Sequence, residues 1–171
     1  RLPVPGQGAF EWQGFRRDLP REYNPSRAFI ATANHNIQPD GYAPPLMFKN
    51  ADTRFERITR LRQLLVPGRT YSLDDHQRMQ NDALSLRAAA DLPQFKGWTT
   101  ADADVERGRA LLADWDAVYS KDSAAAALYE AWRAGPARTP VPSHSTRERQ
   151  AALETGLRAA IDRLTTIQGR D

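Results

Sequence analysis

The sequence predicts an α+β chain, in which a mostly helical polypeptide carries about two short strands near its N-terminus. Two observations support this prediction. Proline and glycine recur through the first forty residues, where they interrupt any helical period. From Asp52 onward, apolar residues recur at three- and four-residue steps, the spacing of one buried helix face. We therefore expect residues 1–50 to be strand and loop and residues 51–171 to be helical.

The two strands are predicted at Ala9–Phe15 and Ala28–Ala33. The first segment is rich in aromatic residues and flanked by glycine, and the second is a short apolar run that contains one threonine. An Asn24-Pro25 turn precedes the second strand, and a loop rich in proline follows it. Both segments lie too close to proline and glycine for a helix to be the better interpretation.

Four helices are predicted after this loop, over residues 52–65, 72–92, 100–115 and 145–168, and residues 124–134 are predicted to form a further unit that is either turn-rich or helical. Pro67-Gly68 ends the first. Ser72 and Thr100 are suitable N-caps for the second and third, and Ser145 with Glu148 forms a capping box for the last.

The organisation predicted is one partial domain over residues 1–171. Residues 135–144 are rich in proline and small side chains, so they are a candidate exposed linker within the helical part. The sequence starts with Arg1 rather than methionine, which we expect of a processed chain or of a piece of a longer protein.

Composition excludes several classes of function. The 24 Lys and Arg nearly balance the 21 Asp and Glu, and they alternate or recur at helical spacing, so we expect no nucleic-acid partner. No apolar run approaches the roughly 20 residues of a membrane span, so no membrane partner is expected. The absence of cysteine excludes disulfides and a thiol nucleophile within this chain. The three histidines are too scattered for a metal motif, and we predict no metal ligand.

Asn34 is the most informative polar residue because it follows the second predicted strand. An amide supplies N–H donors without a titrating proton, which suits an oxyanion that forms as a carbonyl becomes tetrahedral. Taken alone, an asparagine at a strand end more often caps a turn. Arg57, taken alone, is typical of a surface ion pair. The acidic pairs Asp74-Asp75 and Asp114-Trp115-Asp116 are typical of solvated helix faces, while Trp12 and Trp132 are expected to be buried.

A set of short motifs makes the chain similar to the penicillin amidase family of N-terminal nucleophile hydrolases, which includes penicillin acylases and acyl-homoserine lactone acylases. The motifs are, in chain order, Trp12-x-Gly14, Asn24-Pro25, Ala33-Asn34-His35-Asn36, Tyr42 and Arg57-Ile58. They cover about residues 1–95 and resemble the middle of the family's large β subunit. The resemblance is weaker through Trp115-Asp116 and Asp122-Ser123.

The resemblance implies a fold, a reaction and two site residues. The strands would join the sheets of a four-layer αββα fold. Asn34 would be the side-chain donor of the oxyanion hole, and Arg57 would orient that asparagine and the substrate. The nucleophile would be a serine at the N-terminus of the β subunit, outside this chain, so the segment alone is expected to be inactive. The partners implied are the remaining β-subunit segments, the α subunit and a small amide substrate.

The resemblance also bears on metal and location. Penicillin acylase holds a structural calcium ion partly through an aspartate, where this chain has Leu46, and a leucine cannot act as a Ca²⁺ ligand. Asp40 or Asp52 would have to substitute. No cofactor is implied for catalysis, and a periplasmic or secreted location follows from the resemblance alone.

A second hypothesis comes from another class of protein. In this hypothesis the chain is a non-catalytic helical binding or scaffold module that carries an asparagine-rich turn. Substitution of Asn34 in the complete enzyme separates the two, because loss of an oxyanion donor lowers turnover, whereas loss of a turn cap lowers stability.

Overall fold

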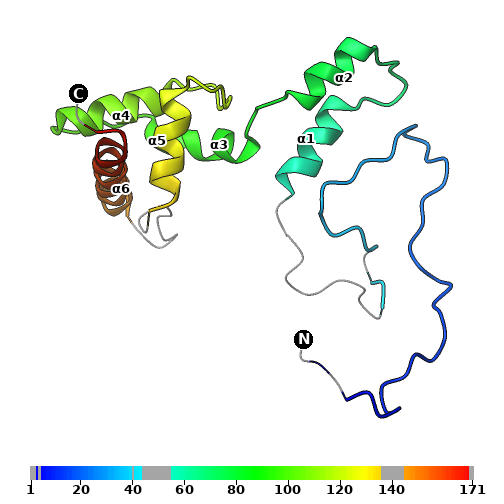
Figure 1. Cartoon of the computed structure of the whole chain (residues 1–171). Helices are drawn as coiled ribbons and strands as arrows, with labels where there is room; N and C mark the ends of the chain where they lie inside the picture. The colour runs from blue at the N-terminus through cyan, green and yellow to red at the C-terminus, as the bar shows by residue number, and fades with distance from the viewer. Residues whose placement is uncertain (1–2, 4, 40, 44–54, 136–144, 170–171) are drawn as a thin grey trace. The chain divides into compact units, whose positions relative to one another are not determined.

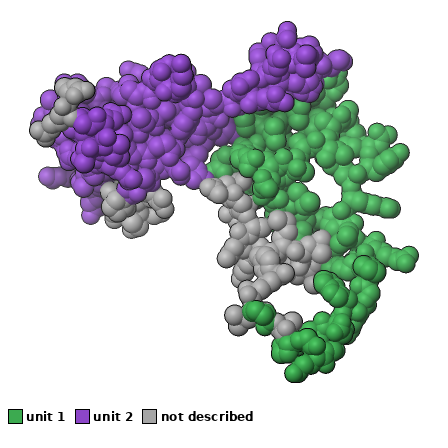
Figure 2. Space-filling model, in the orientation of Figure 1, with its two compact units in different colours: residues 1–69 green, residues 70–171 purple. Residues whose placement is uncertain are grey.

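The computed structural model describes residues 3, 5–39, 41–43, 55–135 and 145–169, and the chain divides into two compact units, residues 1–69 and 70–171 (Figure 2). The described residues are mostly helical, as predicted, and none of their helices is long and apolar enough to cross a membrane. The helices in chain order are α1 (Glu56–Leu64), α2 (Leu73–Gln80), α3 (Leu86–Asp91), the 3₁₀ helix η1 (Leu92–Phe95), α4 (Ala103–Ala113), α5 (Ala124–Arg133) and α6 (Thr146–Gln168) (Figure 1).

Neither predicted strand forms among the described residues of unit 1. Residues 9–15 and 28–33 have no strand assignment, and Trp12, expected in a core, is 94% exposed. The physical reason is that the backbone N–H and C=O groups of a strand need a neighbouring strand, and no described segment pairs with either one. The Asn24-Pro25 turn is confirmed, since the N–H of Ala28 donates to the carbonyl oxygen of Pro25 at 2.9 Å.

Helix α1 is the one helix in the described part of unit 1. It is shorter than the predicted helix, of which residues 52–54 lie outside the described residues, and Leu65 follows it in an extended conformation. Ile58 is its buried side chain, 1% exposed. Gly68 has φ +76°, a left-handed conformation that glycine adopts without steric cost, so the Pro67-Gly68 turn after the helix is confirmed.

The long helix predicted after Ser72 is divided in two. Ser72 and Asp75 form a capping box that starts α2, but the helix ends at Gln80. The backbone then pairs elsewhere, because Tyr119 donates to the carbonyl of Ala83 at 3.0 Å and Ser85 donates to the carbonyl of Ala117 at 2.9 Å. The Ser85 side chain accepts from Ala88 N–H and caps a second helix, α3. A serine that can cap a helix thus competes with helix continuation.

The N-cap of helix α4 lies two residues later than predicted. Its N-cap is Asp102, whose carboxylate accepts from the backbone N–H groups of Asp104 and Val105, whereas Thr100 accepts from Asp102 N–H just before the helix. A carboxylate at this position also favours the positive end of the helix dipole. In α6, the predicted capping box of Ser145 and Glu148 is confirmed, and Gly169 follows the helix with φ +78°.

The core of unit 2 is aromatic and lies where α3, η1, α4, α5 and α6 pack together. Trp132, predicted to be buried, is 2% exposed, and its ring lies edge-on to that of Phe95 at 5.1 Å. Tyr129 is fully buried and donates its hydroxyl to Asp91 at 2.7 Å, and this burial raises the pKa of the phenol. The predicted linker, residues 135–144, lies outside the described residues except for Gly135.

Candidate functional site

Asn34 is held in a turn of unit 1 by two buried neighbours. Ala33 is 8% exposed and His35 is 9% exposed, whereas the side chain between them is exposed. The backbone of Asn34 has φ +57°, in the left-handed region that asparagine tolerates better than most residues. Such conformations concentrate at functional sites because the surrounding structure must maintain them. The turn therefore presents the amide of Asn34 at the surface of unit 1.

Arg57 is presented in a similar way from a different element. It lies in the first turn of α1, and the next residue, Ile58, is the buried residue of that helix. Arg57 itself is exposed. Its guanidinium therefore extends away from a helix whose position is fixed by the buried neighbour.

The two predicted site residues meet in the structure. The Nη1 atom of Arg57 donates a hydrogen bond to the Oδ1 atom of Asn34, with 3.3 Å between the two atoms, although the residues are 23 positions apart in the sequence. The alternative interpretation of Arg57 as one half of a surface ion pair is not borne out among the described residues, where its partner is this amide.

This contact determines which way the amide points. The carbonyl side accepts from Arg57, so the two N–H donors of Nδ2 are left for another acceptor. A cationic donor on the carbonyl also polarises the amide and strengthens its N–H groups as donors. The pair can therefore bind a negatively charged or partly negative oxygen.

A hollow of ≈ 820 Å³ opens beside this turn. Asn34 and Arg57 are not among its lining residues, but His35 and Asn36 are. Its charged lining comprises three arginines and one carboxylate, and its apolar lining includes five large side chains: Arg21, Arg27, Arg62 and Glu22, and Phe29, Ile30, Ile37, Phe55 and Leu65. The walls therefore combine apolar surface with charges of both signs and an excess of cations, which suits an organic molecule that carries a polar or negative group.

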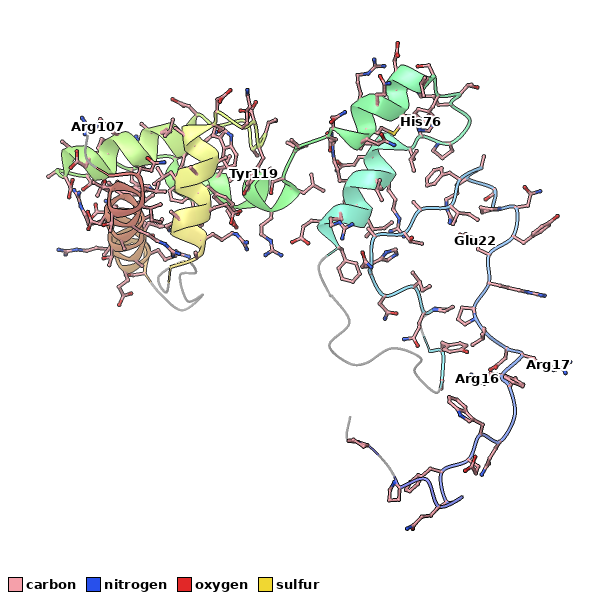
Figure 3. All side chains as sticks on the ribbon, viewed as in Figure 1. Arg16, Arg17, Glu22, His76, Arg107 and Tyr119 are labelled. Atoms are coloured by element: carbon pink, nitrogen blue, oxygen red, sulfur yellow. The ribbon has the colours of Figure 1, made fainter. Side chains whose placement is uncertain are left out.

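Ion pairs hold the irregular backbone around this hollow. Arg27 pairs with Glu22, which Figure 3 labels, and its guanidinium lies 5.5 Å from the centre of the Phe29 ring. Stacking of this kind favours arginine over lysine. The Arg27 side chain is half-buried, so it fixes the two segments before and after the Asn24-Pro25 turn.

Tyr42, one of the motif residues, is fastened to residues 16–18 of the same unit. Its hydroxyl donates to the carbonyl oxygen of Asp18 at 3.4 Å, and the guanidinium of Arg16 lies 5.1 Å from the centre of its ring. Arg16 also pairs with the Asp18 carboxylate at 2.6 Å, and this hydrogen bond lowers the pKa of that carboxyl. Tyr42 therefore has a structural role within the described residues.

One residue of each acidic pair has a structural role. Asp75 completes the capping box of α2, and Asp116 accepts from the N–H of Val118 at 2.9 Å. Among the described residues, no group of three or more His, Asp or Glu side chains could hold a metal ion. Position 46 and the two possible substitutes, Asp40 and Asp52, lie outside the described residues, so the described chain offers no set of calcium ligands to test.

Sequence reasoning missed His35, which was considered only as a metal ligand. Among the described residues of unit 1 it is the buried polar side chain, and its Nδ1 atom accepts from the N–H of Ala33 at 3.3 Å. The local sequence carries no signal of this burial, because Asn34, His35 and Asn36 are three consecutive polar residues. The hydrogen bond across the turn could be found only in the structure.

Comparisons with known proteins agree with the geometry. The family model described as penicillin amidase matches residues 1–169. An acyl-homoserine lactone acylase, QuiP of Pseudomonas aeruginosa, is 32% identical over 91 residues, which are 52% of this chain. The same match covers 10% of the relative, so the chain corresponds to a small part of that protein. The match of the family model over nearly the whole chain shows that it belongs to the penicillin amidase family.

Proposed function

We propose that the complete protein is an amidohydrolase of the acylase type and that the described residues supply its oxyanion donor. The observation that carries this proposal is the hydrogen bond from Arg57 to the Oδ1 atom of Asn34, which occupies the carbonyl side of the amide and not its N–H side. The family model and the acylase relative support the same class of reaction.

The proposed reaction has two steps. The hydroxyl of an N-terminal serine, outside these residues, attacks the carbonyl carbon of a linear amide, and the carbonyl oxygen becomes an oxyanion. The serine's own α-amino group takes the hydroxyl proton and passes it to the amide nitrogen as the C–N bond breaks, so the amine leaves and an ester on the serine remains. Water hydrolyses this ester through a second oxyanion. The residues described here act on both oxyanions, since each carries its charge on the same oxygen.

Asn34 and Arg57 have separate roles in this proposal. Asn34 donates an N–H to the oxyanion, and Arg57 holds the carbonyl side of the amide. Preorganised donors of this kind lower the barrier because they need no reorientation when the charge develops. Arg57 also places a positive charge next to the amide, which favours the transition state over the neutral ground state.

The rest of the proposal concerns what lies outside the described residues. The remaining β-subunit segments and an α subunit would pair with residues 9–15 and 28–33 and complete an αββα fold. The exposure of Trp12 and of Phe15, 94% and 98%, supports a partner surface at the first segment. Catalysis would need no cofactor. The complete protein would be exported to the periplasm or out of the cell. These 171 residues alone would be inactive because the nucleophile is elsewhere.

The test is Asn34→Asp in the complete protein. Aspartate has the shape of asparagine, tolerates the left-handed backbone and can still accept from Arg57, but it has no N–H to donate. We expect kcat for amide hydrolysis to fall by about a hundredfold to a thousandfold, as for loss of one oxyanion donor. The free energy of unfolding should change by no more than about 0.5 kcal/mol.

Asn24→Asp is the matched control. It makes the same chemical change at another exposed asparagine of unit 1 that also has positive φ, 46°, and should leave kcat unchanged. If Asn34→Asp instead keeps turnover, Asn34 is not an oxyanion donor, and the scaffold hypothesis replaces the acylase.

A further inference from the structure

Burial in unit 1 is concentrated around its two candidate site residues. Ala33, His35 and Ile58 are the buried side chains among the described residues of this unit. Ala33 and His35 lie on either side of Asn34, and Ile58 follows Arg57. The three buried residues are therefore the sequence neighbours of Asn34 and Arg57, the two residues that share a hydrogen bond.

His35 is more than an apolar filler in this arrangement. Its Nδ1 atom accepts from the backbone N–H of Ala33, and the bond closes a ring of backbone and side chain that spans Asn34. Because Nδ1 is the acceptor, the ring proton of the neutral imidazole is on Nε2. The imidazole therefore connects the residue before Asn34 to the residue after it.

The hydrogen bond from Ala33 to His35 offsets two unfavourable contributions to the free energy of the turn. The N–H of Ala33 belongs to a buried residue, and a buried donor without an acceptor costs about 1–3 kcal/mol. Asn34 has φ +57°, a conformation that single residues keep only when their surroundings hold it. Without the imidazole acceptor, the turn could relax to an extended backbone and carry the Asn34 amide away from Arg57.

We propose that His35 is a positioning residue for Asn34, which holds the turn in its left-handed conformation through the Nδ1 acceptor. This inference rests on the proposed function of Asn34. His35 does not touch the reacting atoms in this proposal. It acts by keeping the amide within reach of Arg57 on one side and of the substrate oxyanion on the other.

Two substitutions of nearly equal polarity test this in the complete protein. In His35→Asn the amide oxygen is bonded to Cγ, as Nδ1 is in histidine, so the acceptor for Ala33 N–H is kept. In His35→Gln the amide lies one carbon further out, near the position of Nε2, and that acceptor is lost. We expect His35→Asn to keep kcat close to wild type and His35→Gln to lower it by about tenfold to a hundredfold, the size of effect that misplaced groups produce.

A second measurement separates positioning from general damage. KM should be similar in the two variants, because both keep a polar side chain of moderate size. The melting temperature of His35→Gln should be the lower of the two, because in that variant the buried N–H of Ala33 has lost its acceptor. Hydrogen exchange of the peptide that contains Ala33 should be slow in wild type and in His35→Asn, and fast in His35→Gln. Equal kcat in the two variants, or equal loss in both, overturns the inference.

Failure of this inference differs from failure of the proposed function. If Asn34→Asp abolishes turnover while His35→Gln keeps it, the acylase proposal stands and the positioning role is wrong. If Asn34→Asp keeps turnover, both are wrong, whatever the exchange of Ala33 shows.

Discussion

The two units of this chain differ in the size of the core that each one buries among its described residues. Unit 2 buries a continuous aromatic core between its helices, with Trp132, Tyr129 and Phe95 as its largest enclosed side chains. Unit 1 is mostly irregular and buries three of its described residues, while Trp12, Phe15 and Tyr23 are almost fully exposed. The candidate site lies in the unit with the smaller core. Burial of apolar area is the main favourable term in folding, so the described residues of unit 1 gain less of this term than those of unit 2.

Separate expression of the two units gives the largest expected effect. Residues 70–171 should show the far-UV circular dichroism of a helical protein and melt in one cooperative transition, because their core is complete within the unit. Residues 1–69 should show no cooperative melting, because so few side chains leave water.

Two outcomes of this experiment would contradict the difference between the units. A cooperative transition of residues 1–69 alone would mean that unit 1 has a core of its own. Non-cooperative melting of residues 70–171 would mean that both units depend on the rest of the protein. The two units would then not differ in whether they fold alone.

Two tryptophan substitutions sharpen the comparison within the 171-residue chain. Trp132→Ala should lower the free energy of unfolding by about 3–5 kcal/mol, because it leaves a large cavity beside Phe95 and Tyr129. Trp12→Ala makes the same chemical change at a side chain that is 94% exposed and should leave the transition in place. Denaturant titration followed by circular dichroism measures both, and equal losses would show that Trp12 is buried in solution.

The helices of this fold could be predicted from sequence where local signals agree. The N-cap at Ser72 and the capping box at Ser145 are such cases. The interruption between α2 and α3 could not be predicted, because it depends on the pairing of Ala83 and Ser85 with residues more than thirty positions away. The prediction of two strands in unit 1 was wrong among the described residues for a related reason. Composition indicates that a segment prefers the strand conformation, but it does not supply the neighbouring strand that the segment must pair with.

The candidate site was likewise predictable from sequence only in part. Motif order predicted Asn34 and Arg57 as site residues, and their side chains are in contact in the structure; their catalytic roles stay predictions. Neither residue could be distinguished by local chemistry alone, because an exposed asparagine in a turn and an arginine at a helix start are common. His35 escaped prediction because its role depends on which ring nitrogen accepts a hydrogen bond, and no sequence pattern specifies that atom.

The smallest expected effect concerns the surface link between α4 and α6 in unit 2. Asp102 caps α4 and accepts from Nε of Arg158 on α6 at 3.1 Å, and this hydrogen bond lowers the pKa of the Asp102 carboxyl. A group with a lowered folded-state pKa stabilises the fold above its unfolded pKa, about 3.9 for aspartate, and loses that contribution as the pH falls further. Asp102→Asn keeps the N-cap but not the charge, so it should lower the melting temperature by a few degrees near pH 7.

The pH dependence separates the charge from the cap in that variant. The difference in melting temperature between wild type and Asp102→Asn should shrink below about pH 4 and vanish once the wild-type carboxyl is protonated in the folded state. Asp122→Asn is the control, because Asp122 is exposed and lies 4.0 Å from Lys121, so it should change melting little at any pH. A difference that stays constant with pH would assign the effect of Asp102 to helix capping. The link from α4 to α6 would then contribute nothing to the stability that distinguishes unit 2 from unit 1.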